Sequence, residues 1–95
     1  MLPAVPRDLS VVLPETVTAL QAEEVIRAAA PETLESLGLF DVFVGEDIED
    51  GQRSLGWRLV FRHPDRTLTD GEVETAMASI RTALEGSFDV RFRGS

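Results

Sequence analysis

The fold is decided by residues 39–62, LFDVFVGEDIEDGQRSLGWRLVFR. Two runs in this stretch alternate between apolar and polar residues, which is the period of a half-buried β-strand. The connection between the runs, residues 45–52, carries four acidic residues and two glycines, so it predicts a solvated hairpin loop. The stretch therefore predicts an antiparallel pair of strands over residues 39–44 and 54–62.

The alternation also assigns a face to each side chain of the hairpin. On the second strand the packed side is expected to hold Leu55, Trp57, Leu59 and Phe61. Trp57 is therefore predicted to be a core residue, not an exposed ring. On the first strand the packed side is expected to hold Phe40, Val42 and Val44. Asp41 and Phe43 then lie on the opposite side.

Upstream of the hairpin, the sequence predicts a strand followed by a helix. Residues 7–13 alternate, with Leu9, Val11 and Leu13 on one face. Thr18 and Gln21 have the spacing of a helix capping box, which predicts a helix that continues to about Ala30. Pro31 cannot extend that helix, so residues 31–37 are expected to form a kinked extra turn.

Downstream, the order of helix and strand repeats. Thr69 and Glu72 form a second capping box, and apolar residues then recur at helical spacing as far as Leu84. Gly86 stands where a helix end favours a residue with positive φ. Residues 87–93 alternate again and predict a last strand.

The predicted order is βαββαβ, an α+β arrangement whose two helices must cover one face of the sheet. Right-handed crossovers then give a ferredoxin-like sandwich with an antiparallel four-stranded sheet in the order 4-1-3-2. All 95 residues are expected to form one domain. The second face of the sheet is predicted to be uncovered.

That uncovered face is where binding chemistry is expected. The chain has a formal net charge of −8, which argues against binding nucleic acid through a global basic field. The face itself is biased toward arginine, with Arg58, Arg62, Arg91 and Arg93 as candidates for phosphate contact or, alternatively, for ordinary ion pairs with Asp41 and Asp89. Phe43 could stack on an unpaired base or be covered by another protein surface. Asp41 and Ser54 could bind base edges.

Several other classes of protein are excluded or disfavoured. The chain contains no cysteine and a single histidine, His63, so thiol chemistry is excluded and a serine triad is disfavoured. No glycine-rich phosphate loop is present, and the acidic connection lacks the spacing of a calcium loop. No run of about 18 apolar residues exists, so no membrane partner is expected, and the chain is read as cytoplasmic. No catalysis is expected in this chain.

Longer runs of the sequence resemble a known family. These runs are Arg7–Ser10 in the first strand, Leu39–Phe43 with Gly45, then Gly51, Arg53–Leu55, Trp57 and Arg58, and finally Arg66–Asp70 with Glu72 and Val73. In order and spacing they resemble the ferredoxin-fold anticodon-binding domain at the C-terminal end of the bacterial phenylalanyl-tRNA synthetase β subunit. The Arg66–Asp70 run is interpreted as structural, positioning and capping the second helix.

The resemblance implies a function for the face. The parent enzyme would be an ATP- and magnesium-dependent phenylalanine-tRNA ligase of α2β2 assembly, acting in protein synthesis, while this module would contact the anticodon stem-loop of the tRNA. Neither DNA nor a cofactor bound to this domain is implied. The implied RNA-binding residues are Asp41, Phe43, Arg53, Ser54, Gly56 and Arg58. Arg91 and Arg93, on the last strand, become peripheral candidates.

The sequence departs from the family at three places. The family usually has Tyr at position 43, Ala at position 56, and Lys at position 52 or 53, where this chain has Phe43, Gly56, Gln52 and Arg53. Phe43 keeps the aromatic face but lacks a hydroxyl. Two alternatives stay open: an amino-acid-sensing regulatory domain, with its ligand near the turn at residues 14–16, and a module whose open face only docks another domain.

Overall fold

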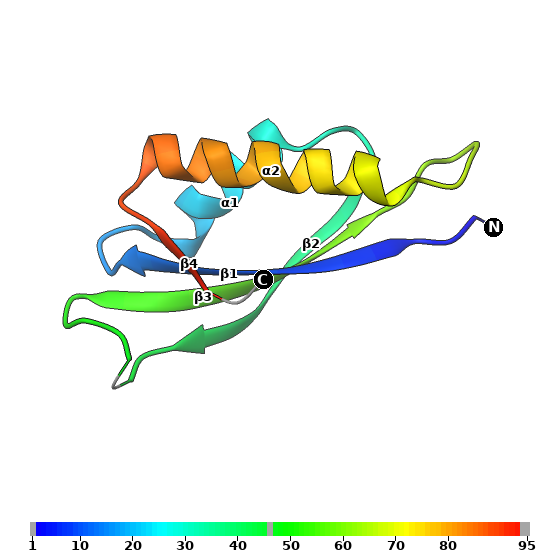
Figure 1. Cartoon of the computed structure of the whole chain (residues 1–95). Coiled ribbons are helices and arrows are strands. Elements are labelled where there is room, and N and C mark those ends of the chain that lie inside the picture. The colour runs from blue at the N-terminus through cyan, green and yellow to red at the C-terminus, as the bar shows by residue number, and fades with distance from the viewer. Residues whose placement is uncertain (1, 46, 94–95) are drawn as a thin grey trace.

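The computed structural model describes residues 2–45 and 47–93. Its elements are β1 (Val5–Pro14), α1 (Ala19–Ala29), β2 (Leu34–Phe43), β3 (Gln52–Phe61), α2 (Asp70–Ser87) and β4 (Arg91–Arg93). The strands form one antiparallel sheet in the order β2-β3-β1-β4, and both helices lie on the same side of it (Figure 1). The predicted ferredoxin-like βαββαβ sandwich is confirmed.

Both helices begin at the predicted capping boxes. The Thr18 side chain accepts a hydrogen bond from the Gln21 N–H, and the Gln21 side chain accepts one from the Thr18 N–H. Thr69 and Glu72 make the same reciprocal pair at the start of α2. Each box satisfies two N–H groups that a helix start leaves without partners, which fixes where the chain turns from loop to helix.

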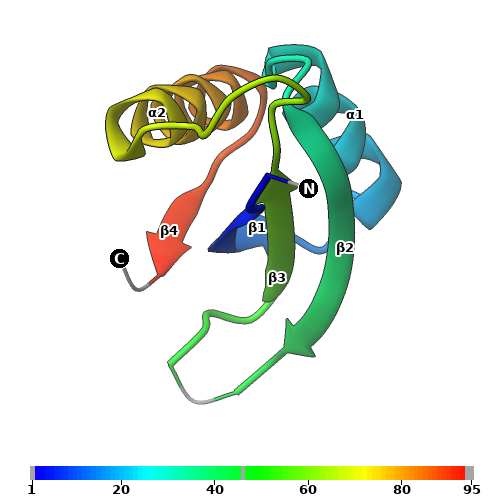
Figure 2. The same ribbon diagram turned by 90° about the vertical axis from the view of Figure 1, so that its right-hand side faces the viewer.

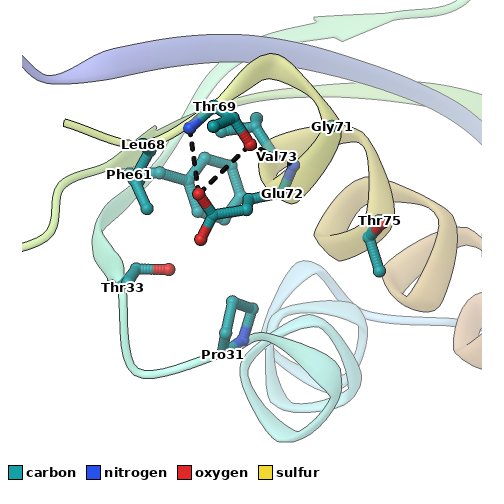
Figure 3. Close-up of a pocket in the computed structure, with 9 residues that line it drawn as sticks. All are labelled: Pro31, Thr33, Phe61, Leu68, Thr69, Gly71, Glu72, Val73 and Thr75. Carbon is teal, nitrogen blue, oxygen red and sulfur yellow. Dashed lines mark hydrogen bonds between the residues drawn. The ribbon is translucent and has the colours of Figure 1, made fainter.

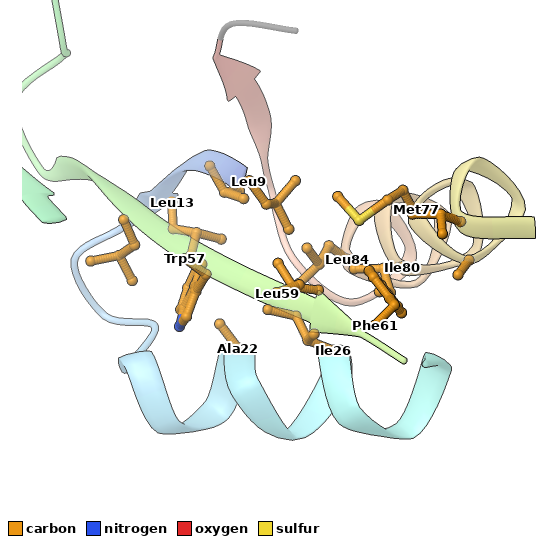
Figure 4. Packing of buried hydrophobic residues seen from close by; sticks show 14 of the residues in the cluster. Leu9, Leu13, Ala22, Ile26, Trp57, Leu59, Phe61, Met77, Ile80 and Leu84 are labelled. Carbon is orange, nitrogen blue, oxygen red and sulfur yellow. The ribbon is translucent and has the colours of Figure 1, made fainter. Parts of the chain in front are cut away.

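The core lies between the sheet and the two helices (Figure 4). The sheet contributes the predicted residues Leu9, Val11, Leu13, Leu55, Trp57, Leu59 and Phe61, and the helices contribute Ala22, Ile26, Met77, Ile80 and Leu84 among others. Trp57 is fully buried, and its indole Nε1–H donates to Glu23 Oε2 at 2.9 Å. The prediction that Trp57 is a core residue is confirmed. The predicted apolar sides of β1 and β3 are the sides that face the helices.

Three local predictions were wrong. Residues 31–33 make only a short turn and β2 already begins at Leu34, so the expected extra turn over 31–37 does not form. Gly86 lies inside α2, which runs to Ser87 and is capped by Phe88, whose N–H donates to the Leu84 carbonyl with φ at −141°. Because Ser87 belongs to α2 and Phe88 caps it, the last strand is limited to β4 and does not span residues 87–93 as predicted.

The second half of β2 also departs from its prediction. Phe40, Val42 and Val44 were expected to pack on the helix side, but all three are exposed. This part of β2 curves away from the helices toward the hairpin end (Figures 1 and 2), so no helix covers it. In addition, the register with β3 shifts between Leu39 and Asp41, which marks a β-bulge at Phe40.

Candidate functional site

The side chains that alternate with the core form a second, helix-free face of the sheet. Pairing across the strands arranges them in three transverse rows. The first row contains Gly38, Arg58 and Asp8. The second row contains Asp41, Gly56, Ser10 and Arg93. The third row, nearest the hairpin end, contains Phe43, Ser54, Val12 and Arg91. These rows are called the helix-free face below.

Phe43 lies on this face as predicted, with an arginine beside it. Its side chain is 40% exposed, and the guanidinium carbon of Arg93 lies 5.3 Å from the centre of its ring. The ring tip leans on the hairpin connection, because a β-carbon at Gly45 would come within 2.6 Å of Phe43 Cζ. Arg91 and Arg93 were predicted to be peripheral because they lie two strands away from the pair of strands that holds Asp41 and Phe43. In space Arg93 is not peripheral, since its guanidinium lies beside the Phe43 ring.

The hairpin end of the helix-free face is partly covered, which the sequence did not indicate. Ser54 is only 4% exposed, and Val12 and Ile48 are buried although neither belongs to the main core. Arg91 Nη2 donates to the Asp47 carbonyl at 3.4 Å, joining β4 to the connection between β2 and β3. The connection extends below the sheet, away from the helices (Figure 2). The expected solvated loop therefore closes over part of the face.

Arg58 is on the face as predicted, but it is already paired. Its Nε and Nη2 donate to the two carboxylate oxygens of Asp8, at 2.8 and 3.1 Å. The hydrogen bonds from Arg58 lower the pKa of Asp8, and those to Asp8 raise the pKa of Arg58. The pair holds the guanidinium plane in place and compensates its charge. The carboxylate partner is Asp8, not Asp41 or Asp89.

Gly56 and Asp41 meet at the centre of the face, and a residue that sequence reasoning missed lies with them. Phe40, 58% exposed, places ring atoms 3.4 and 3.6 Å from where a β-carbon of Gly56 would be, and Asp41 Cβ lies 3.2 Å from the same point. The guanidinium carbon of Arg58 is 5.8 Å from the Phe40 ring centre. Alternation had placed Phe40 on the other side. The one available signal was Gly56, because a glycine inside a strand often marks a bulge or a close approach.

Arg53 is the one predicted site residue that the structure does not bring to this face. Its guanidinium donates to the carbonyls of Pro14 and Val17, at 3.3 and 2.9 Å, and so braces the turn between β1 and α1. Arg62 is likewise engaged elsewhere, with Glu35 and with the carbonyl of Leu2. Five of the six predicted residues, Asp41, Phe43, Ser54, Gly56 and Arg58, therefore lie together.

A cavity of about 550 Å³ lies on the other side of the sheet, beside the start of α2 (Figure 3). Its lining includes Pro31, Phe61, Leu68 and Val73, together with Thr69 and Glu72. The last two bond to each other, and Glu72 also accepts two hydrogen bonds from Arg66. These bonds, led by those from Arg66, lower the pKa of Glu72 to about 2. The polar groups here serve the helix cap, as predicted for residues 66–70.

Within residues 2–45 and 47–93, no three side chains of His, Cys, Asp or Glu gather as metal ligands would. In that same part, no helix has both the length and the apolar character needed to span a membrane.

The helix-free face can bind a flat, polar ring system. It offers the exposed rings of Phe40 and Phe43, the exposed carboxylate of Asp41 as an acceptor, and guanidinium groups beside both rings. Aromatic rings and guanidinium planes are the surfaces on which unpaired bases stack. The arrangement is suited to non-covalent recognition.

The chain is similar to one segment of much longer proteins. A phenylalanine–tRNA ligase beta subunit of Synechococcus sp. (strain JA-3-3Ab) is 47% identical over 91 residues, which cover 96% of this chain and 11% of the relative. The protein of that name in Moorella thermoacetica is 49% identical over 83 residues, covering 87% and 10%. In Bacillus subtilis the values are 38% over 92 residues, covering 97% and 11%. This chain thus spans about a tenth of the curated relatives it matches.

A family model covers nearly the whole chain. The model described as "Ferredoxin-fold anticodon binding domain" matches residues 1–93, which includes all four strands, both helices and every residue of the helix-free face. With this match and the observed βαββαβ sandwich, the chain belongs to the family of ferredoxin-fold anticodon-binding domains.

Proposed function

We propose that this chain binds the anticodon stem-loop of a phenylalanine tRNA, as one module of a phenylalanine–tRNA ligase β subunit. The observation that carries the proposal is the part of the helix-free face between its centre and the hairpin end, where Asp41 and Phe43 lie two residues apart on β2 with Arg93 over the Phe43 ring. The family and the relatives described above support the choice of RNA over other flat ligands.

In this proposal each residue has a separate task. Phe43 stacks on an unpaired anticodon base through its π face, and Asp41 accepts a hydrogen bond from an amino or imino group on a base edge. Arg93 supplies positive charge for the neighbouring phosphate. Because Ser54 is only 4% exposed, its hydroxyl would reach RNA only after a local rearrangement of its surroundings.

The rest of the ligase belongs to the proposal as well. The parent would attach phenylalanine to tRNA using ATP and magnesium in the cytoplasm, in an α2β2 assembly. In that assembly, activation of the amino acid would be the task of other parts of the ligase. This module would contribute binding energy and discrimination between tRNAs.

The amino-acid-sensing alternative finds less support. Its ligand would lie near the turn after β1, but the Arg53 guanidinium already occupies the carbonyls of Pro14 and Val17 there. Heating the protein with free amino acids provides a direct check, because a specific ligand raises the unfolding temperature in proportion to its binding.

A titration followed by NMR tests the proposal. The isotope-labelled chain receives a stem-loop with the phenylalanine anticodon or, as control, one with three altered anticodon bases. Signals of Asp41, Phe43 and Arg93 should shift with the first RNA and much less with the second. Phe43→Ala should weaken binding by about 1 to 3 kcal/mol. Shifts confined to α1 and α2, or equal shifts with both RNAs, would refute the proposal.

A further inference from the structure

Phe40 is a large apolar residue that is exposed to solvent instead of packing in the core. It occupies the β-bulge between Leu39 and Asp41, and its side chain is 58% exposed, more than that of Phe43. A bulge residue is free of the strict alternation of a strand, so its side chain can turn to either face. Here it turns to the helix-free face, where its ring lies over the backbone of Gly56.

Gly56 provides the space for that ring. A β-carbon at this position would lie 3.4 Å from Phe40 Cζ and 3.2 Å from Asp41 Cβ, and the second distance is short enough that the neighbouring side chain would have to shift slightly. The absence of a side chain lets the Phe40 ring settle low against β3. An aromatic ring that is supported by the sheet and largely exposed is a surface on which a second ring can stack.

Arg58 extends this surface, and Asp8 fixes its position. The guanidinium carbon lies 5.8 Å from the Phe40 ring centre, while both carboxylate oxygens of Asp8 hold the guanidinium at 2.8 and 3.1 Å. Because Asp8 compensates the charge, the contribution of Arg58 comes more from its flat face than from long-range attraction to phosphate. Guanidinium planes beside aromatic rings are established stacking surfaces for unpaired bases.

From this geometry we propose that Phe40 and Arg58 form a second base-stacking position, next to the one at Phe43, so that the face binds two consecutive unpaired nucleotides of RNA. This inference rests on the proposed function and specifies its ligand more closely. Asp41 lies between the two rings in sequence and can accept a hydrogen bond from either base. The surroundings favour a nucleotide over an apolar protein segment, because a carboxylate and a guanidinium flank the ring.

The test compares single-residue variants with single-base changes in the RNA. A fluorescent anticodon stem-loop is prepared in a series in which each loop nucleotide in turn is abasic, and affinity is measured by anisotropy. With the unmodified chain, abasic sites at two adjacent positions should each weaken binding about 5- to 100-fold. With Phe40→Ala, one of these two positions should lose its effect, and with Phe43→Ala the neighbouring one should.

Val42→Ala is the matched control. It removes an exposed apolar side chain of β2, 57% exposed, from the opposite side of the sheet, so it should leave RNA affinity unchanged. Phe40→Leu keeps apolar bulk but removes the π face and should bind more weakly than the unmodified chain. Thermal unfolding checks that each variant is folded, which is expected because Phe40 and Val42 lie outside the core.

The outcomes separate this inference from the proposed function. If the unmodified chain binds no stem-loop, both are overturned. If it binds and Phe43→Ala weakens binding while Phe40→Ala does not, only the second stacking position is overturned. If Phe40→Ala and Val42→Ala instead change the sedimentation of the chain by itself and not RNA affinity, this part of β2 is a protein-binding surface, which also overturns the inference.

Discussion

Removing the charge of Arg93 should change how RNA binding responds to salt. Two arginines of the helix-free face lie beside aromatic rings, and of these two, within the described residues, Arg58 is the one paired with a carboxylate, that of Asp8. Among the ion pairs found within residues 2–45 and 47–93, none includes Arg93. A guanidinium without such a partner can approach a phosphate at little cost, whereas Arg58 must first give up two hydrogen bonds. Arg93 is therefore the expected phosphate contact.

The size of the effect follows from counterion release. Each phosphate contact to a single strand contributes about 0.7 to the slope of log K against log salt concentration. Arg93→Gln should lower that slope by about 0.7, so that its loss of affinity shrinks about two- to threefold when salt is raised fourfold. Arg58→Gln should weaken binding through lost stacking while changing the slope much less.

The assay is anisotropy of a labelled anticodon stem-loop at several salt concentrations. Arg27→Gln, on the exposed surface of α1, is the control because it makes the same change in net charge on the helix side. An equal change of slope for Arg93→Gln and Arg27→Gln would mean that only the overall field matters. The reasoning is refuted if Arg93→Gln leaves the slope of log K against log salt concentration unchanged while Arg58→Gln lowers it. That result would show that pairing with Asp8 does not keep Arg58 from contacting phosphate.

Three further predictions concern stability. Thr69→Ala removes the N-cap of α2 and should lower the free energy of unfolding by about 1 kcal/mol in urea titrations, against a negligible change for the exposed Thr82→Ala. Glu72→Gln keeps a capping-box side chain but loses the charge that Arg66 stabilises. Since the pKa of Glu72 is lowered to about 2, its stabilising effect is complete above about pH 4.5 and disappears toward pH 2. The difference in melting temperature between Glu72→Gln and the unmodified chain should shrink over that range, and a difference independent of pH would contradict the assignment. Leu84→Ala, at a fully buried position, should cost about 2 to 5 kcal/mol, measured by urea unfolding, whereas a cost below about 1 kcal/mol would contradict the observed packing.

Most of the fold follows from local patterns in the sequence. Alternation in β1 and β3 identifies the core side of both central strands, since each is covered by helices along most of its length. The capping boxes at Thr18 and Thr69 locate the helix starts, because the same two side chains that form the pattern make the hydrogen bonds. Helices on one side of four strands then leave few topologies, and the strand order follows.

The errors arise where no local pattern determines the structure. A bulge at Phe40 adds one residue to β2, and alternation counts straight through it, while the one available signal, Gly56, lies on the neighbouring strand. The end of α2 was placed at Gly86 on conformational preference, but packing of Leu84 and capping by Phe88 extend the helix past it. Arg93 on β4 contacts Phe43 on β2 although β3 and β1 lie between them in the sheet. The alternation of residues along each strand does not indicate such a contact between side chains of distant strands.

The acidity of the chain and the proposed RNA contact are reconciled by where the charges lie. The chain has seventeen acidic and nine basic residues, yet the three rows of the helix-free face contain Arg58, Arg91 and Arg93 against Asp8 and Asp41. At physiological salt, fields from exposed charges are screened over about 8 Å, so acidic groups on the far side of the helices act only weakly on this face, whereas those of the hairpin connection, such as Asp47, lie beside it. The net charge of −8 does not attract RNA over long distances, so the proposed binding would depend on short-range stacking. If the module is part of a β subunit, as proposed, it would gain occupancy when other parts of that subunit hold the RNA, because tethering supplies effective concentrations in the millimolar range. Low affinity of the isolated chain is then compatible with strong discrimination between anticodons, since discrimination is a difference between two binding free energies and does not depend on their size.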